Sequence, residues 1–449
     1  MKMIKLITAV GFTLLSFMSQ ATDLVKPRIQ VQSELAQPII LENGEEKNYL
    51  RISLIGEKNE PTGRVPINLA IVIDRSGSMS GERIKKAKEA AILAVNMLNE
   101  DDTLSIIAYN TNAEVILSST KVKNKQKIIS LIEKNLVANG GTALFAGVSK
   151  GINQVSKQLS RDNVNRIILL SDGQANIGPS SVSELSELAI VAAKKNIAIS
   201  TFGIGDDYNE QLMSSIASYS DGNHVFVDDT SKLENVFVRE FKDVMSTVAQ
   251  DIVITINLKD GTKPVRLMGR DGIIKGNKVI IKMNQLYANQ ERYVLLEVIP
   301  PKGKAGENKT LANIEFSYND LLNKKVEKEN QTVNIAYTNK QDVVDKAVDP
   351  NIIAESEIQK VILANDEAVA LYNQGKTEEA KSLLTVSAEK LSEESMRYMG
   401  IAPEASEKMK AQMGINQALA DAIEKDDAKV ARKKMVEKQF QSRQNKIEK

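Results

Sequence analysis

Residues 68–83 read Asn-Leu-Ala-Ile-Val-Ile-Asp-Arg-Ser-Gly-Ser-Met-Ser-Gly-Glu-Arg. The apolar run at the start of this segment predicts a buried strand with Asp74 at its carboxyl end. A tight turn then presents the hydroxyls of Ser76 and Ser78, and Gly77 allows the backbone to turn closely. We expect a helix to begin at about Ser80, with the Ser80 hydroxyl as its N-terminal cap.

The side chains of this turn offer only hard oxygen donors, namely one carboxylate and two hydroxyls. Such donors suit Mg²⁺, Mn²⁺ or Ca²⁺ rather than softer metals. Mg²⁺ also keeps part of its water shell, which leaves positions for an oxygen of a ligand. A turn of this composition can also simply cap a helix, so the motif alone leaves both interpretations open.

Strand-like and helical stretches alternate from Ile67 to about Thr247, with strand-like runs at 67–73, 104–109, 166–170 and 198–202. In the first helical stretch, apolar residues recur at helical spacing between Ile84 and Leu98. This alternation predicts an α/β fold with a doubly wound, mostly parallel sheet. Ligands of such sheets bind beyond the carboxyl ends of the strands, which is where we place Asp74.

The turn resembles the metal-ion-dependent adhesion site of von Willebrand factor type A domains, in which Asp-x-Ser-x-Ser follows an apolar strand. Two later ligands of that family are also matched, a Thr in a glycine-bearing loop and an Asp after a later strand. The resemblance covers roughly residues 66–248. It implies a divalent metal, Mg²⁺ or else Mn²⁺ or Ca²⁺, held by Asp74, Ser76, Ser78, Thr142 and Asp172. A site with the correct fold but little metal affinity is the alternative.

The same resemblance implies a function. In this family the hydroxyls typically touch the metal while the carboxylates act partly through water, which leaves the ion incompletely neutralised. An Asp or Glu of a protein partner would then complete its coordination, and this gives specificity for an acidic side chain at an interface. The implied function is metal-dependent protein binding, in adhesion or assembly, and not catalysis. The whole chain resembles bacterial proteins related to the heavy chains of inter-alpha-trypsin inhibitor.

The sequence departs from each of three enzyme motifs at one required residue. A phosphatase of the haloacid dehalogenase type needs a second carboxylate at the position of Ser76 to act as general acid. A phosphate-binding P-loop needs Lys after its second Gly, but Gly81 is followed by Glu82. A nucleophile elbow needs Ser where this chain has Met79. The only histidine, His224, lies beside a strand-like run, and we interpret it as structural.

Alternating apolar residues flank the α/β region on both sides, at 29–54 and again from 251 to about 338. Alternation with a period of two predicts half-buried strands. We therefore predict one β-sandwich, made from residues 22–65 and 249–340, into which the α/β domain of residues 66–248 is inserted. Three separate domains in a row are the alternative.

Residues 341–449 are strongly charged and predict a helical tail. Within it, residues 367–384 read as two helices with Gly375 at the turn, but no 34-residue repeat follows. The basic end of the tail is typical of a solvated helix end, and contact with anionic lipid or an acidic partner is the alternative. A second function therefore stays open, a structural scaffold that acts mainly through these helices and carries a vestigial metal site.

Residues 1–21 have the features of a secretory signal peptide. Lys2 and Lys5 precede an apolar run over 6–18, which is shorter than the ~20 residues that span a membrane. Small residues at positions 19 and 21 fit a signal peptidase site, so we expect the mature chain to begin near Thr22. We expect a periplasmic protein, with secretion as the alternative.

Composition excludes several classes of protein. The chain has 59 Lys plus Arg against 58 Asp plus Glu, and a dedicated nucleic-acid binder would show a basic excess. It has no cysteine, which removes disulfides, zinc–thiolate sites and cysteine nucleophiles. An exported chain of this composition must hold its fold by core packing, which is feasible at 449 residues.

Overall fold

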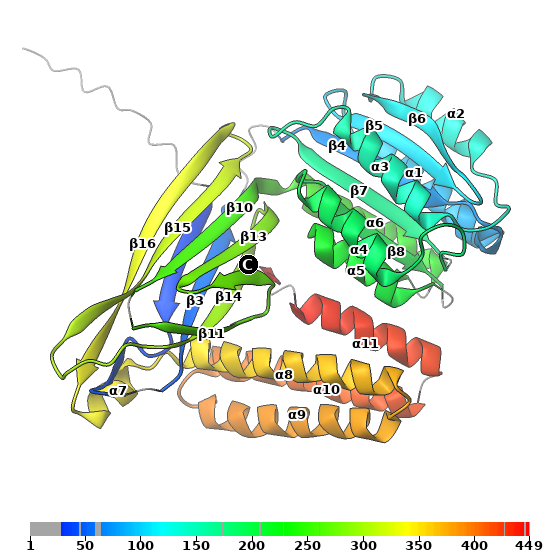
Figure 1. Cartoon of the computed structure of the whole chain (residues 1–449). Coiled ribbons are helices and arrows are strands. Elements are labelled where there is room, and N and C mark those ends of the chain that lie inside the picture. Colours follow the sequence, from blue (N-terminus) through cyan, green and yellow to red (C-terminus); the bar gives the residue numbers. More distant parts are fainter. Residues whose placement is uncertain are drawn as a thin grey trace, which may run out of the picture.

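The computed structural model describes residues 28–443, apart from 45, 59–63, 173, 206–207, 228, 260 and 426, and also residues 446–448. Within these residues the strands form three sheets, and a helical region follows them (Figure 1). The expected signal peptide lies outside the described residues. No helix in the described part of the chain combines the length and apolar content needed to cross a membrane.

The α/β region is built on a six-stranded sheet with the order β6-β5-β4-β7-β8-β9. Its parallel strands are β4 (Ile67–Asp74), β5 (Thr103–Tyr109), β7 (Val164–Ser171), β8 (Ala198–Ile204) and β9 (His224–Val227). One edge strand, β6 (Ala113–Lys121), runs antiparallel to β5. The predicted doubly wound, mostly parallel sheet is therefore confirmed.

Helices cover both faces of this sheet, which explains why β4 is apolar at nearly every position. Leu69, Ile71 and Ile73 face a core shared with α1 (Glu82–Met97), α2 (Lys125–Asn135) and α6 (Leu233–Met245). Ala70 and Val72 face a second core shared with α3 (Leu144–Ser156), α4 (Val182–Ala193) and α5 (Glu210–Ser220). Successive side chains of a strand point to opposite faces, so both cores are served by one continuous apolar run.

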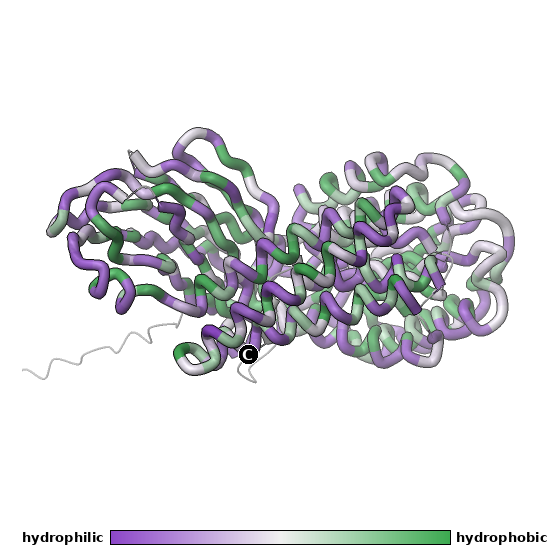
Figure 2. Tube along the Cα trace, turned by 90° about the horizontal axis from the view of Figure 1, so that it is seen from below, coloured by the Kyte–Doolittle hydropathy of each residue, from purple (hydrophilic) through white to green (hydrophobic). Residues whose placement is uncertain are grey.

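Two antiparallel-rich sheets form the β-sandwich. The first has the order β1 (Ile29–Leu35), β3 (Asn48–Gly56), β14 (Gln290–Ile299), β11 (Lys263–Met268), and β17 (Lys446–Glu448) also pairs with β14. The second has the order β12 (Gly272–Lys275), β13 (Lys278–Tyr287), β10 (Thr247–Leu258), β15 (Asn308–Asp320), β16 (Lys325–Thr338), β2 (Ile39–Leu41). Hydrophobic and hydrophilic residues alternate along these strands (Figure 2).

Strands from both sides of the α/β region share these sheets, since β3 pairs with β14 and β2 pairs with β16. The α/β region is therefore inserted into one sandwich, as predicted. The alternative of three separate domains in a row is wrong.

The helical tail contains α7 (Gln341–Ala347), α8 (Pro350–Asn373), α9 (Thr377–Tyr398), α10 (Pro403–Lys425) and α11 (Ala428–Arg443). The turn between α8 and α9 falls at Gly375, which has a positive φ of 78°, in agreement with the sequence pattern. Figure 1 shows α8, α9 and α10 lying side by side below both the sandwich and the α/β region, with α11 between these helices and the α/β region.

The predicted solvated helix end is correct for Lys429, Lys434 and Lys438 of α11, which are exposed, but wrong for Arg432 and Lys433, which face the α/β domain. Lys433 is only 3% exposed, and its Nζ lies 3.5 Å from Oε2 of Glu210. Arg432 pairs with the same carboxylate at 2.6 Å, and the ring of Phe440 packs edge-on against His224. The physical reason is the buried carboxylate of Glu210, which supplies a counter-charge on the α/β domain that the sequence pattern does not reveal.

A fully buried arginine joins the α/β domain to the sandwich. Arg166 of β7 pairs with Glu240 of α6, and its Nη1 donates to Oε1 of Gln285 in β13 at 2.9 Å. Burial of an arginine is tolerated only where charge and hydrogen bonds compensate it. The ion pair therefore fixes α6 against the sheet at the boundary with the sandwich.

Removing one partner of this ion pair should destabilise the protein strongly. We expect Glu240→Ala to lower the free energy of unfolding by about 3–5 kcal/mol, because it leaves the Arg166 guanidinium buried without a counter-charge. Glu234→Ala, on the exposed side of the same helix, should change it by less than about 0.5 kcal/mol. Urea unfolding followed by circular dichroism measures both, and equal effects of the two variants would contradict this account.

Candidate metal centre

The carboxyl end of β4 positions the first motif of the predicted site, Asp74-x-Ser76-x-Ser78. Asp74 is the last residue of β4, and a short 3₁₀ turn over Gly77–Met79 separates it from α1. The prediction that Ser80 caps α1 is wrong: the N-cap is Gly81, and the Ser80 hydroxyl donates backward to the carbonyl oxygen of Gly77 at 2.8 Å. The reason is the 3₁₀ turn, which delays the start of α1 to Glu82.

Four of the five predicted site residues are joined by one chain of hydrogen bonds. The backbone N–H of Ser76 donates to Oδ1 of Asp74 at 2.8 Å, and the hydroxyls of Ser76 and Ser78 lie 3.1 Å apart. The Ser78 hydroxyl donates in turn to Oδ1 of Asp172 at 2.9 Å. Residues almost a hundred positions apart in the sequence therefore meet at the edge of the sheet where β4 and β7 end.

The loop that carries Thr142 reaches the same turn through its backbone. Gly77 N–H donates to the carbonyl oxygen of Gly140 at 2.9 Å, and Asn139 N–H donates to that of Arg75 at 2.9 Å. Thr142 is 3% exposed, and its N–H donates to Oδ1 of Asn176 at 2.8 Å. The structure thus brings the Thr142 loop against the first motif.

Sequence reasoning missed three residues that shape this site. The Ser171 hydroxyl donates to Oδ2 of Asp74 at 2.7 Å, and the Arg83 guanidinium donates through Nη1 to Oδ2 of Asp172 at 2.6 Å. Asn176 anchors the Thr142 loop. Ser171 directly precedes Asp172, so the sequence could have predicted that Ser171 lies near the site. Nothing in the sequence pattern indicates Arg83 or Asn176.

Burial of the two carboxylates governs the electrostatics of the site. Asp74 and Asp172 are both 0% exposed. Burial raises the pKa of Asp74 to about 6, against hydrogen bonds from Ser76 and Ser171 that oppose the rise. Burial also raises the pKa of Asp172, and the Arg83 guanidinium opposes it. Among the described residues, the two buried carboxylates thus meet one guanidinium, that of Arg83, so negative charge exceeds positive charge at the site.

This donor set fits a hard divalent cation. Carboxylate and hydroxyl oxygens are the ligands that Mg²⁺ and Ca²⁺ prefer, and a dication would offset the charge of both carboxylates. Among the described residues, no group of three or more His, Cys, Asp or Glu side chains gathers to hold a metal. Metal binding at this edge would therefore depend on the hydroxyls as much as on the two carboxylates.

His224 lies on a strand remote from Asp74. It is the first residue of β9 and pairs with Thr201, midway along β8, and the sheet order places β9 three strands away from β4, which carries Asp74. Burial lowers the pKa of His224 to about 3, and Nδ1 lies 2.8 Å from the Thr201 hydroxyl. A buried neutral imidazole in this position agrees with the structural interpretation.

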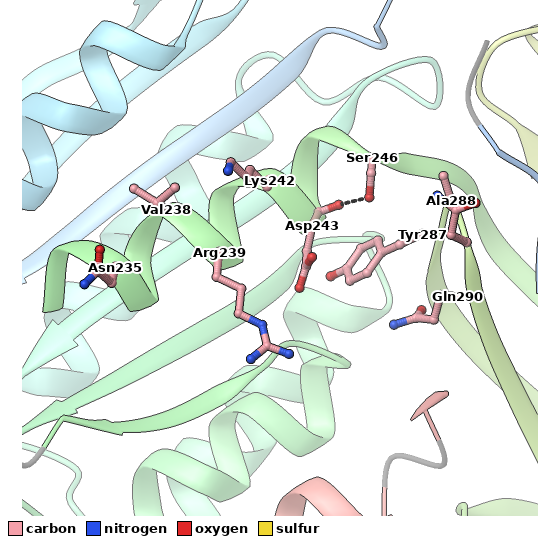
Figure 3. Close-up of a pocket in the computed structure, with 10 residues that line it drawn as sticks. Asn235, Val238, Arg239, Lys242, Asp243, Ser246, Tyr287, Ala288 and Gln290 are labelled. Atoms are coloured by element: carbon pink, nitrogen blue, oxygen red, sulfur yellow. Dashed lines mark hydrogen bonds between the residues drawn. The ribbon is translucent and has the colours of Figure 1, made fainter. Parts of the chain in front are cut away.

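A separate hollow lies between α6 and the turn from β13 to β14 (Figure 3). Arg239 and Asp243 point toward it from α6, and the amide of Gln290 points toward it from β14. Its lining includes none of the five predicted site residues: Asn235, Val238, Arg239, Lys242, Asp243, Ser246, Tyr287, Ala288, Asn289 and Gln290. The metal site is therefore a feature of the sheet edge and not of this hollow.

Comparison with known proteins identifies the α/β region. Residues 68–239 match the family model of the von Willebrand factor type A domain. An uncharacterized protein of Synechocystis sp. is 28% identical over 284 residues, which are 61% of this chain and 66% of that protein. Inter-alpha-trypsin inhibitor heavy chain H3 of Mus musculus is 28% identical over 181 residues, 38% of this chain and 20% of that protein. The chain thus spans less than two thirds of the length of these relatives.

The fold is shared more widely. A solved structure of a von Willebrand factor type A protein from Catenulispora acidiphila has a TM-score of 0.69 at 15% identity and covers 89% of both chains. At this identity the likeness concerns the fold alone, and it includes the sandwich and helices as well as the α/β region. The resemblance inferred from the motifs is confirmed.

The raised pKa of Asp74 predicts how stability varies with pH in metal-free protein. The folded carboxyl binds its proton more tightly than the unfolded one, so its contribution to stability falls as pH rises from about 4 to about 6 and stays lost above that. Asp74→Asn carries no such charge. In EDTA at pH 7.5 we expect it to be more stable than the unsubstituted protein by about 1–3 kcal/mol, with the difference vanishing near pH 4.

Urea unfolding at pH 4, 5, 6 and 7.5 measures this difference. Comparing the two proteins at each pH cancels the titration of groups that do not interact with Asp74. A constant difference across this range would show that the Asp74 carboxyl titrates normally.

Proposed function

We propose that this chain, whose residues 68–239 form a von Willebrand factor type A domain, binds a protein partner through a divalent cation at the carboxyl edge of its sheet. Domains of this family generally bind proteins. The observation that carries the proposal is the pair of fully buried carboxylates, Asp74 and Asp172, with hydroxyls between them and too little positive charge around them.

The hydroxyls and the carboxylates of the site would have different roles in holding the cation. Ser76, Ser78 and Thr142 would hold the cation through their hydroxyl oxygens, and the two carboxylates would supply the negative charge. When bound, the cation supplies an electrophilic centre that an Asp or Glu of a partner can ligate. Mg²⁺ is our first choice, with Mn²⁺ and Ca²⁺ as alternatives. The Ser76 N–H and the Ser171 hydroxyl orient Asp74.

A scaffold that acts through its helices is the second candidate. The helices contact the rest of the chain closely: Arg51 of the sandwich pairs with Glu355 of α8 at 2.6 Å, and Glu210 pairs with Arg432 of α11. Deleting residues 350–449 would leave both Arg51 and Glu210 without these partners. Point substitutions at the metal site therefore separate the two functions more cleanly than a truncation.

The metal proposal predicts a specific calorimetric result. Titration of Mg²⁺, Mn²⁺ and Ca²⁺ into metal-stripped protein should show one saturable site, and Asp74→Ala or Ser76→Ala should weaken binding by at least about a hundredfold. Ser80→Ala is the matched control, because its hydroxyl bonds to Gly77 in the same turn, and should bind like the unsubstituted protein. A folded protein that binds none of the three cations would favour the vestigial site and the scaffold.

We also propose export to the periplasm, with secretion as the alternative, on the basis of the leader-like residues 1–21 and the absence of cysteine. Expressed in a Gram-negative host, the chain should be recovered from the periplasmic fraction and begin near Thr22 on N-terminal sequencing. A chain that keeps Met1 and stays in the cytoplasm would contradict export without affecting the metal proposal.

A further inference from the structure

Arg83 covers the buried Asp172 carboxylate from the solvent side. It lies in the first turn of α1, its Nη1 is 2.6 Å from Oδ2 of Asp172, and the same atom donates to the carbonyl oxygen of Ser78 at 3.4 Å. The Arg83 side chain is 29% exposed, whereas that of Asp172 is 0% exposed. The guanidinium therefore has solvent on one side and the candidate metal site on the other.

A second element of the fold leaves room for this guanidinium. Gly205, which follows β8, has a positive φ of 76°, and a Cβ at this position would lie 2.7 Å from Nη2 and 3.0 Å from Cζ of Arg83. Any larger residue there would push the guanidinium away. The position of Arg83 over Asp172 is thus determined by two separate elements, α1 and the loop after β8.

The two carboxylates of the site are neutralised differently. Asp172 pairs with Arg83, whereas Asp74 is hydrogen-bonded to the neutral groups of Ser76 and Ser171. A divalent cation held between the two carboxylates would balance both charges by itself. The guanidinium would then be an excess positive charge beside that cation, and like charges close together repel.

We propose that Arg83 is a resident counter-ion, which neutralises Asp172 while no metal is bound and withdraws toward solvent when a divalent cation is held. The proposal rests on the proposed metal site and adds its regulation. Arg83 lowers the metal affinity, because it must be displaced, and it stabilises the metal-free domain, because it keeps Asp172 paired. The residue thus sets the cation concentration at which the site fills.

Substitution of the two arginines beside the site tests this directly. Arg83→Gln removes the competing charge, so we expect Mg²⁺ to bind roughly tenfold more tightly by calorimetry. Its melting temperature should fall in EDTA and recover with saturating Mg²⁺. Arg75→Gln is the matched control: it removes the same charge from the same motif, but the Arg75 guanidinium pairs with Glu114 and the carbonyl oxygen of Asn135 instead. Its Mg²⁺ affinity should change by less than about twofold.

Arg83→Lys keeps the charge and should bind Mg²⁺ close to the unsubstituted level. If Arg83→Gln does not fold without metal, Gly205→Ala displaces the guanidinium without removing it and should also tighten binding. Unchanged or weaker Mg²⁺ binding by folded Arg83→Gln, with normal binding by the unsubstituted protein, overturns the counter-ion role alone. Absence of binding in the unsubstituted protein and in all folded variants overturns the metal site itself.

Discussion

Parallel pairing of β4 with β5 and β7 is the constraint on which the rest of the molecule depends. Parallel strands end at the same edge of a sheet, so the loops that follow β4 and β7 must lie together however far apart they are in the sequence. This is why the Ser78 hydroxyl meets the Asp172 carboxylate. The sheet is covered by helices on both faces, and the two carboxylates are fully buried at the edge where the loops after β4 and β7 meet.

Burial of the carboxylates at that edge lowers the stability of the metal-free protein and favours the binding of a cation. Water would solvate free carboxylates well, whereas the described part of the chain offers Asp74 hydrogen bonds from the neutral groups of Ser76 and Ser171. The pKa of Asp74 rises as a result, and a bound cation would favour the charged carboxylate and so oppose this rise. A site that was fully neutralised by its own side chains would fold more easily but would attract a metal less.

The sequence predicted the elements whose cause is local or periodic. The apolar run of β4, the alternation in the sandwich strands and the glycine turn between α8 and α9 each leave a pattern in consecutive residues. The missed features pair residues that are remote in the chain: Arg83 with Asp172, Arg166 with Glu240, and Glu210 with α11. Charge partners across such separations have no periodicity, so a single sequence cannot identify them. The prediction that Ser80 caps α1 was wrong for a different reason, because a 3₁₀ turn displaces the start of α1.

The attachment of the sandwich leaves the candidate metal edge open. Arg166 lies near the amino end of β7 and bonds to Gln285, and the carbonyl oxygen of Arg161, just before β7, accepts a hydrogen bond from Gln250 at 2.6 Å. Asp221, just before β9, pairs with Arg292 of β14. All of these contacts lie at the amino edge of the sheet. β7 has eight residues, which at about 3.3 Å per residue separate the two edges by roughly 25 Å. A partner that ligated a cation at the carboxyl edge would therefore approach a surface that the sandwich does not occupy.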